Sequence, residues 1–103
     1  MYQDISTPEQ YNDLISKGAV AIDVRTPAEY NESKIPNINT GFDWNAGEFY
    51  DKVDDLDASK DYVLVCRSGN RSVQAALFLK SNGFTGNLYN LQGGMMGWSG
   101  ATE

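Results

Sequence analysis

The residues best suited to chemistry lie in one short segment, Cys66–Ser72 (CRSGNRS). Cys66 is the only cysteine in the chain, and the chain contains no histidine. A thiolate is the nucleophilic form of cysteine, and the positive charge of a nearby arginine favours this form over the neutral thiol. Arg67 and Arg71 supply two planar guanidinium groups that can hold a tetrahedral oxyanion. The segment therefore predicts a thiolate nucleophile beside an anion site, working without a histidine base.

Two elements must position this cysteine. The apolar run Tyr62–Cys66 predicts a buried strand. After the loop, the spacing of the apolar residues predicts a helix to Asn82, which Gly83 terminates. In open α/β sheets, sites form where strands end and helix N-termini point. We therefore expect the amides of Arg67–Arg71 to surround the sulfur and to favour an anion there. Gly69 permits the positive φ that such a tight loop often needs.

The rest of the chain alternates between helix and strand signals. Thr7-Pro8 and Thr26-Pro27 each have the pattern of a capping box. The first expected helix begins at Pro8, after the Thr7 cap, and is ended by Gly18, and the second covers residues 27–33. A third expected helix is capped by Asn45 and carries Phe49, Val53 and Leu56. The expected strands cover residues 19–24, 38–40 and 87–91. This order predicts an α/β fold with a mostly parallel sheet and right-handed crossovers. Because 103 residues are too few for two ordinary domains, we expect one domain over residues 1–103.

Composition excludes several classes of function. The net charge of −6 disfavours nucleic acid as a partner, and no run of basic residues offers a membrane anything to bind. No apolar run approaches the roughly 20 residues of a membrane helix, and residues 1–18 lack the pattern of a signal peptide. We expect a soluble, cytoplasmic monomer, or a periplasmic one if a signal peptide was removed before Met1. With one cysteine and no histidine the usual zinc site cannot be built, so we expect no metal and no cofactor.

The segment from Cys66 to Ser72 resembles the active-site loop of the rhodanese-like domains. Ala21–Tyr30 (AIDVRTPAEY) resembles the amino-terminal signature of that family, while residues 83–84 (GF) and Leu91–Trp98 (LQGGMMGW) resemble its carboxyl-terminal ones. The match covers nearly the whole chain in the right order and spacing. One departure is Ser33–Asn37 (SKIPN), where the family usually has Gly-His-Ile-Pro-Gly.

The resemblance implies a five-stranded, mainly parallel sheet with helices on both faces. It also implies sulfur transfer: the Cys66 thiolate takes a sulfane sulfur from a small anionic donor such as thiosulfate, and sulfite leaves. A thiol or a protein acceptor then removes the outer sulfur of the persulfide. Cys66 is the expected catalytic residue. The expected substrate-binding residues are Arg67, Ser68, Gly69, Asn70 and Arg71.

Two other functions compete with this interpretation. A sulfur carrier or a partner-binding module would lack efficient turnover, and a carrier would keep Cys66 because it too needs the persulfide. A thiol-dependent phosphatase or arsenate reductase would use the same thiolate, but tyrosine-type phosphatases place arginine six positions after cysteine. Here that position is Ser72, and the six-residue loop ending at Arg71 is that of sulfurtransferases.

Residues outside the loop receive structural interpretations. Asp23 and Arg25 flank one residue at a strand end, so we expect an ion pair that fixes the turn and can include Glu29. We expect Trp98 to pack near the site. Trp44, Phe42 and Met95 fit a pocket wall and the core equally well.

Overall fold

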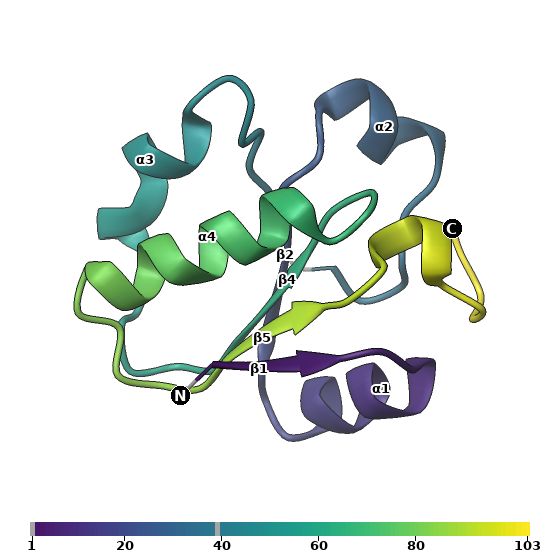
Figure 1. The fold of residues 1–103 in the computed structure, drawn as a ribbon, viewed down its shortest axis with the longest axis horizontal. Coiled ribbons are helices and arrows are strands. Elements are labelled where there is room, and N and C mark those ends of the chain that lie inside the picture. The colour runs from purple at the N-terminus through teal and green to yellow at the C-terminus, as the bar shows by residue number, and fades with distance from the viewer. Residues whose placement is uncertain (1, 39) are drawn as a thin grey trace.

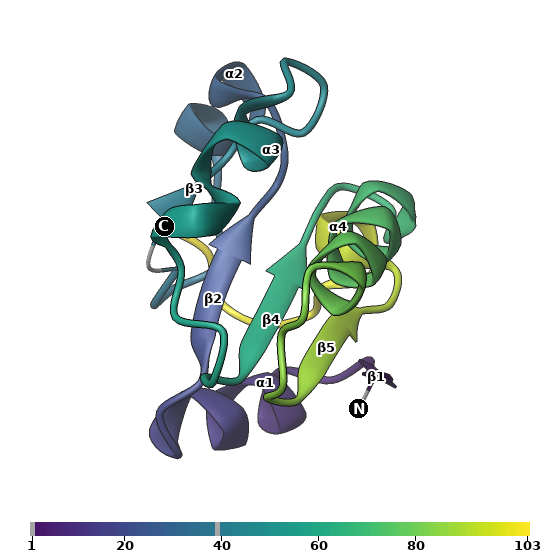
Figure 2. The same ribbon diagram turned by 90° about the vertical axis from the view of Figure 1, so that its left-hand side faces the viewer.

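The computed structural model describes residues 2–38 and 40–103. Its centre is a five-stranded sheet in the order β1-β5-β4-β2-β3, and every neighbouring pair is parallel (Figures 1 and 2). The strands are β1 (Tyr2–Ile5), β2 (Val20–Asp23), β3 (Thr40–Gly41), β4 (Tyr62–Val65) and β5 (Leu88–Leu91). All four residues of the central strand β4 are buried. The predicted α/β fold with a mainly parallel sheet is confirmed.

Helices cover both faces of this sheet (Figure 2). They are α1 (Pro8–Ser16), α2 (Pro27–Glu32), α3 (Glu48–Lys52) and α4 (Asn70–Ser81), with short 3₁₀ turns η1 (Val53–Asp55) and η2 (Gly94–Gly97). Alternate residues of β4 point to opposite faces. Leu64 joins the core cluster that contains Leu79 of α4, and Val63 joins the cluster that contains Tyr11 of α1. Because two apolar layers enclose β4, its end is a rigid place to hold a reactive side chain.

Both predicted capping boxes are present. The Thr7 hydroxyl accepts from the Gln10 N–H at 3.1 Å, and the Gln10 side chain accepts from the Thr7 N–H at 3.1 Å. Thr26 and Glu29 repeat this arrangement at the start of α2. Reciprocal capping satisfies donors that the first helical turn leaves unpaired. It therefore fixes the start of α2, the helix that carries Glu29.

The predicted cap of α3 was wrong. Asn45 does not cap α3: Gly47, with φ of 74°, precedes the helix, and Asp43 Oδ1 accepts instead from the Ala46 N–H at 3.2 Å. The expected strand over residues 38–40 includes Asn39, which lies outside the described residues, and β3 covers Thr40–Gly41.

The strand β1 was not predicted from the residue pattern. Of its four residues only Ile5 is buried, so the run lacks the apolar alternation of a half-buried strand. Its register comes from backbone pairing with β5, which places Tyr2 beside Leu88 and Asp4 beside Asn90. In the described part of the chain, no helix has the length and apolar character needed to cross a membrane.

Candidate active site

Cys66 is the first residue after β4, and its side chain is fully buried. The Gly69 N–H donates a hydrogen bond to Cys66 Sγ, with the nitrogen 2.9 Å from the sulfur. Gly69 has a φ of 97° and immediately precedes α4, so the loop turns the amide back toward the sulfur. A backbone donor and the start of a twelve-residue helix both favour negative charge on Sγ. The expected strand–loop–helix setting is confirmed, with Gly69 as the loop amide that contacts the sulfur.

The η2 turn holds the base of this loop. The Met95 and Met96 N–H groups donate to the carbonyls of Cys66 and Arg67, each at 2.9 Å. Gly94 has a φ of 54°, and a Cβ on it would lie 2.6 Å from the Arg67 carbonyl carbon. Only glycine fits this approach. The sequence signal for this contact is the Gly93-Gly94 pair, which is typical of a turn but does not indicate what the turn touches.

Arg71 pairs with Glu29 across the site. Its Nη1 and Nη2 donate to Glu29 Oε1 and Oε2 at 2.9 and 3.1 Å, and the side chains are 20% and 26% exposed. The hydrogen bonds from Arg71 lower the pKa of Glu29 to about 2, although burial opposes the shift. The same bonds raise the pKa of Arg71. Arg71, expected to bind substrate, thus already holds a carboxylate.

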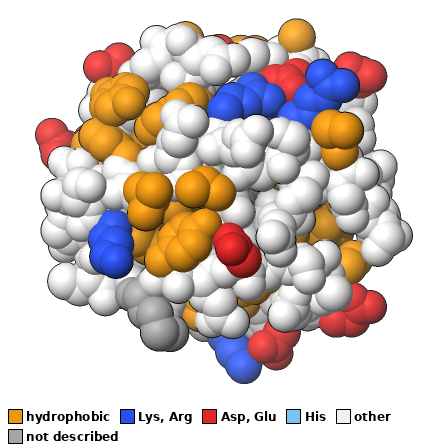
Figure 3. Space-filling view, in the orientation of Figure 1, with side chains coloured by type: hydrophobic (Ala, Val, Ile, Leu, Met, Phe, Trp, Pro, Cys, Tyr) orange, Lys and Arg blue, Asp and Glu red, His pale blue; other side chains and the backbone are white. Residues whose placement is uncertain are grey.

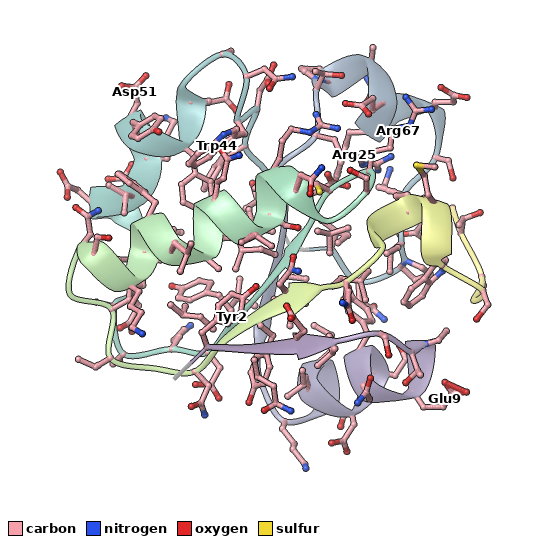
Figure 4. All side chains as sticks on the ribbon, viewed as in Figure 1. Tyr2, Glu9, Arg25, Trp44, Asp51 and Arg67 are labelled. Atoms are coloured by element: carbon pink, nitrogen blue, oxygen red, sulfur yellow. The ribbon has the colours of Figure 1, made fainter. Side chains whose placement is uncertain are left out.

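Arg67 lies on the exposed side of the loop. Within the described residues it makes no ion pair, unlike Arg25 and Arg71. It lines a cleft of about 340 Å³ whose other lining residues are Arg25, Glu29, Glu32, Ser33, Met95 and Met96. Figure 4 shows Arg67 and Arg25 at the same end of the molecule, and in Figure 3 basic and acidic side chains meet over that end. Ser68 and Asn70 are also exposed there.

A chain of polar side chains leads away from the buried face of Cys66. Ser72 Oγ lies 3.3 Å from Cys66 Sγ and hydrogen-bonds Asn90 Oδ1. Asn90 Nδ2 donates to Asp4 Oδ1 at 3.1 Å, and the Tyr2 hydroxyl donates to the same oxygen at 2.8 Å. Burial, with help from Asp4, raises the pKa of Tyr2 to about 12. Sequence reasoning missed this network, although Asn90 is a polar residue inside an otherwise apolar strand signal.

The predicted pair of Asp23 and Arg25 is present and buried. Arg25 Nε donates to both Asp23 carboxylate oxygens at 3.0 Å, and its Nη2 reaches Asp23 Oδ2 at 2.7 Å. Arg25 Nη2 also donates to the Ser33 carbonyl at 2.6 Å, which ties the end of α2 to the end of β2. Glu29 takes no part, because it binds Arg71 instead. Arg25 is one of the residues that line the cleft, so this pair fixes part of its wall.

The aromatic residues are mainly core. Trp98 packs edge-on against Tyr11 of α1, with ring centroids 5.5 Å apart, and does not line the cleft. Trp44 packs against Phe49 and Phe78, at 5.7 and 6.3 Å. Met95 does line the cleft. In the described ranges, no three His, Cys, Asp or Glu side chains are placed to hold a metal ion together.

Comparisons with known proteins show the family of the chain. The model of the rhodanese-like domain family matches residues 7–101. The chain belongs to the rhodanese-like domain family. Its buried cysteine, Gly-containing loop and α4 start thus occupy the region that the family match covers.

Relatives of this rhodanese-like domain carry sulfurtransferase names. The chain is 39% identical over 82 residues to the putative sulfurtransferase YtwF of Bacillus subtilis, covering 80% of this chain and 75% of YtwF. It is 34% identical over 91 residues to the thiosulfate sulfurtransferase GlpE of Pseudomonas syringae, covering 88% and 82%. The crystal structure of a rhodanese-like domain protein from Staphylococcus aureus superimposes with a TM-score of 0.78 at 31% identity, covering 94% of this chain and 91% of that one.

Proposed function

We propose that this rhodanese-like domain is a sulfurtransferase that carries a sulfane sulfur on Cys66 as a persulfide. The observation that carries the proposal is the Gly69 N–H aimed at the sulfur of the only cysteine, at the start of α4. That geometry favours an anionic sulfur without a histidine base. The thiosulfate sulfurtransferase name of the GlpE relative supports thiosulfate as the donor to test first.

The proposed reaction has two displacements. The Cys66 thiolate attacks the sulfane sulfur of thiosulfate, so a bond from Sγ to that sulfur forms as the sulfur–sulfur bond of thiosulfate breaks. Sulfite leaves with the electron pair of the broken bond. A thiophilic acceptor, such as a thiolate or cyanide, then attacks the outer sulfur and returns Cys66 to a thiolate. No net proton or external oxidant is required.

The cleft beside the loop supports a small anionic donor. Arg67 lines it and makes no ion pair with any described residue, so its guanidinium can meet the sulfonate group. Arg71 is less available because Glu29 occupies both of its terminal nitrogens. Met95 and Met96 add polarizable surface at the rim. We therefore assign donor binding first to Arg67, with Ser68, Gly69, Asn70 and Arg71 as the surrounding loop.

The test is thiosulfate:cyanide turnover on the purified protein, with Cys66→Ser as the matched variant and intact mass recorded after thiosulfate treatment. We expect turnover that disappears in Cys66→Ser, together with a mass gain of one sulfur on the unsubstituted protein. Full activity in Cys66→Ser would overturn the mechanism. Treating the loaded protein with dithiothreitol should release the added sulfur, which distinguishes a persulfide from the irreversibly oxidised sulfinic and sulfonic acids.

Other results would point to other functions. A stable added sulfur without turnover would indicate a carrier that needs its own protein acceptor. Neither turnover nor added sulfur would reject thiosulfate as donor, and phosphatase and arsenate reductase assays would follow.

A further inference from the structure

The hydroxyl of Ser72 has two acceptors within reach and one hydrogen to give. Cys66 Sγ lies 3.3 Å from Ser72 Oγ, and Asn90 Oδ1 lies on the other side of the same oxygen. Ser72 is fully buried and Asn90 is 2% exposed, so water does not compete for either contact. A serine hydroxyl donates one hydrogen bond and can accept others. At any moment, therefore, the hydrogen of Ser72 serves either the sulfur or the asparagine.

Asp4 fixes which end of the Asn90 amide faces Ser72. An ionised carboxylate only accepts hydrogen bonds. Asp4 Oδ1 receives Asn90 Nδ2 at 3.1 Å and the Tyr2 hydroxyl at 2.8 Å. The nitrogen of the Asn90 amide must therefore face Asp4, and its oxygen must face Ser72. The parallel pairing of β1 with β5 places Asp4 directly beside Asn90, so this orientation is built into the sheet.

The protonation state of Cys66 decides where the Ser72 hydrogen is needed. While Cys66 is a thiol, its S–H can donate to Ser72 Oγ, and the Ser72 hydroxyl can donate to Asn90 Oδ1. When the thiol loses its proton to water, the sulfur becomes an acceptor. If Ser72 turns to the thiolate, the buried oxygen of Asn90 loses this donor, and an unpaired buried acceptor is unfavourable.

We propose that Asn90 is a positioning residue that competes with Cys66 Sγ for the hydroxyl hydrogen of Ser72 and so sets how strongly that hydroxyl stabilises the thiolate. The inference deepens the proposed function, because it concerns the nucleophile of that reaction. In the persulfide, Sγ has no proton and the charge lies on the outer sulfur, so the Ser72 hydrogen can return to Asn90. The competition for the Ser72 hydrogen therefore affects only the free thiolate, the form of Cys66 between one sulfur transfer and the next.

The other charges around Cys66 are the same in all the variants needed for a test. Arg71 at the start of α4 interacts electrostatically with Cys66 and Asp23, and Arg67 lies on the loop. Glu29 of α2 faces Arg71, and Asp4 of β1 lies behind Asn90. Substitutions at Ser72 and Asn90 remove no charge. A difference between these variants therefore reports the hydrogen bonds rather than a changed field.

The experiment follows the ultraviolet absorbance of the Cys66 thiolate against pH, with Cys66→Ser as the blank. The quantity compared between variants is the midpoint of this titration, the pH at which half of the thiol has become thiolate. We expect the midpoint of Asn90→Leu to move to lower pH, because the Ser72 hydroxyl then serves the sulfur alone. We expect the midpoint of Ser72→Ala to move to higher pH, because a hydrogen bond to a charged group is worth more than one to a neutral group. In Ser72→Ala/Asn90→Leu the Asn90 substitution should have no further effect. Asn12→Leu, an exposed asparagine on α1, is the matched control and should not move the midpoint.

An unmoved midpoint in Asn90→Leu, or a shift that persists when Ser72 is alanine, would overturn the proposal. A merely structural Asn90 would lower the unfolding temperature and leave the midpoint in place. If Asn90→Leu does not fold, the side-chain amide signals of Asn90 can be followed by NMR in the unsubstituted protein. They should move with the Cys66 titration, and should not do so in Ser72→Ala; static signals in the unsubstituted protein would reject the competition. No sulfur donor is present, so these results do not depend on the outcome of the turnover assay.

Discussion

The guanidinium of Arg71 holds both carboxylate oxygens of Glu29, although 42 residues separate the two in the chain. The pair joins α2 to the start of α4, the helix that follows the Cys66 loop. Because Glu29 also caps α2 through Thr26, a single carboxylate connects the capping of one helix to the active-site loop of another. The pair is therefore both a structural link and a limit on the availability of Arg71.

Glu29→Gln should destabilise the protein by about 1 kcal/mol at neutral pH, since a partly exposed pair is screened by water. Glutamine keeps the capping contact. The folded-state pKa of Glu29 is about 2, below its ordinary 4.5, so the stabilisation is fully present above about pH 4.5 and is lost as pH falls toward 2. Denaturant unfolding of both proteins across this range measures it. The two curves should converge at the acid end.

The matched control for this change is Glu32→Gln, on the same helix and exposed. It should leave stability almost unchanged at neutral pH. If Glu29→Gln and Glu32→Gln cost the same at every pH, the pair with Arg71 contributes nothing specific.

Arg67→Ala should raise the KM for thiosulfate about tenfold, the effect of losing one charge-assisted contact, with a smaller change in kcat. The reason is that Arg67 lines the cleft with no ion pair to a described residue. Steady-state kinetics with Lys80→Ala as control would check this, because Lys80 is exposed near the other end of α4. A similar rise in KM for Lys80→Ala would mean that net charge, rather than Arg67, attracts the donor.

Gly94→Ala should destabilise the protein by at least about 2 kcal/mol, because it combines a left-handed backbone with overlap against the Arg67 carbonyl. Turnover should fall as well, since η2 holds the Cys66 loop through the Met95 and Met96 amides. Gly97→Ala is the control within the same turn: a Cβ there meets nothing within 4 Å. Thermal unfolding of the two variants compares them directly. Equal unfolding temperatures would show that the loop can move away from Gly94 at little cost.

Asp23→Asn should cost about 3 kcal/mol of unfolding free energy, because it leaves the Arg25 guanidinium buried without its carboxylate. Asp13→Asn breaks an exposed pair with Lys17, whose side chains are 59% and 70% exposed, and should cost almost nothing. Denaturant unfolding measures both. The double change Asp23→Asn/Arg25→Gln should recover part of the loss, whereas no recovery would show that the hydrogen bond to Ser33, rather than the charge, matters more.

Much of the fold could be predicted from local sequence patterns. The capping boxes at Thr7 and Thr26 and the apolar run of β4 were predictable because their determinants lie within a few residues of one another. The edge strand β1 was not, since its partner β5 lies more than eighty residues away and supplies the hydrogen bonds that define it. The predicted cap of α3 was wrong although its determinants are local: Gly47 precedes the helix, and Asp43 rather than Asn45 accepts the hydrogen bond in the turn before it.

By itself the sequence determined which atoms can react here: one thiol, placed between a buried strand and a helix start, with arginines beside it and no histidine anywhere. Those properties are fixed by composition and short-range order. Only the tertiary structure decided which partner each of the surrounding side chains contacts. Arg71 binds Glu29 from another helix, and Arg67 lines the cleft. Behind the sulfur, Asn90 of β5 contacts Ser72 and in turn donates a hydrogen bond to Asp4 of β1. A hydrogen bond or ion pair depends on distances of a few ångströms between groups far apart in the chain, and only the packing of sheet and helices sets those distances.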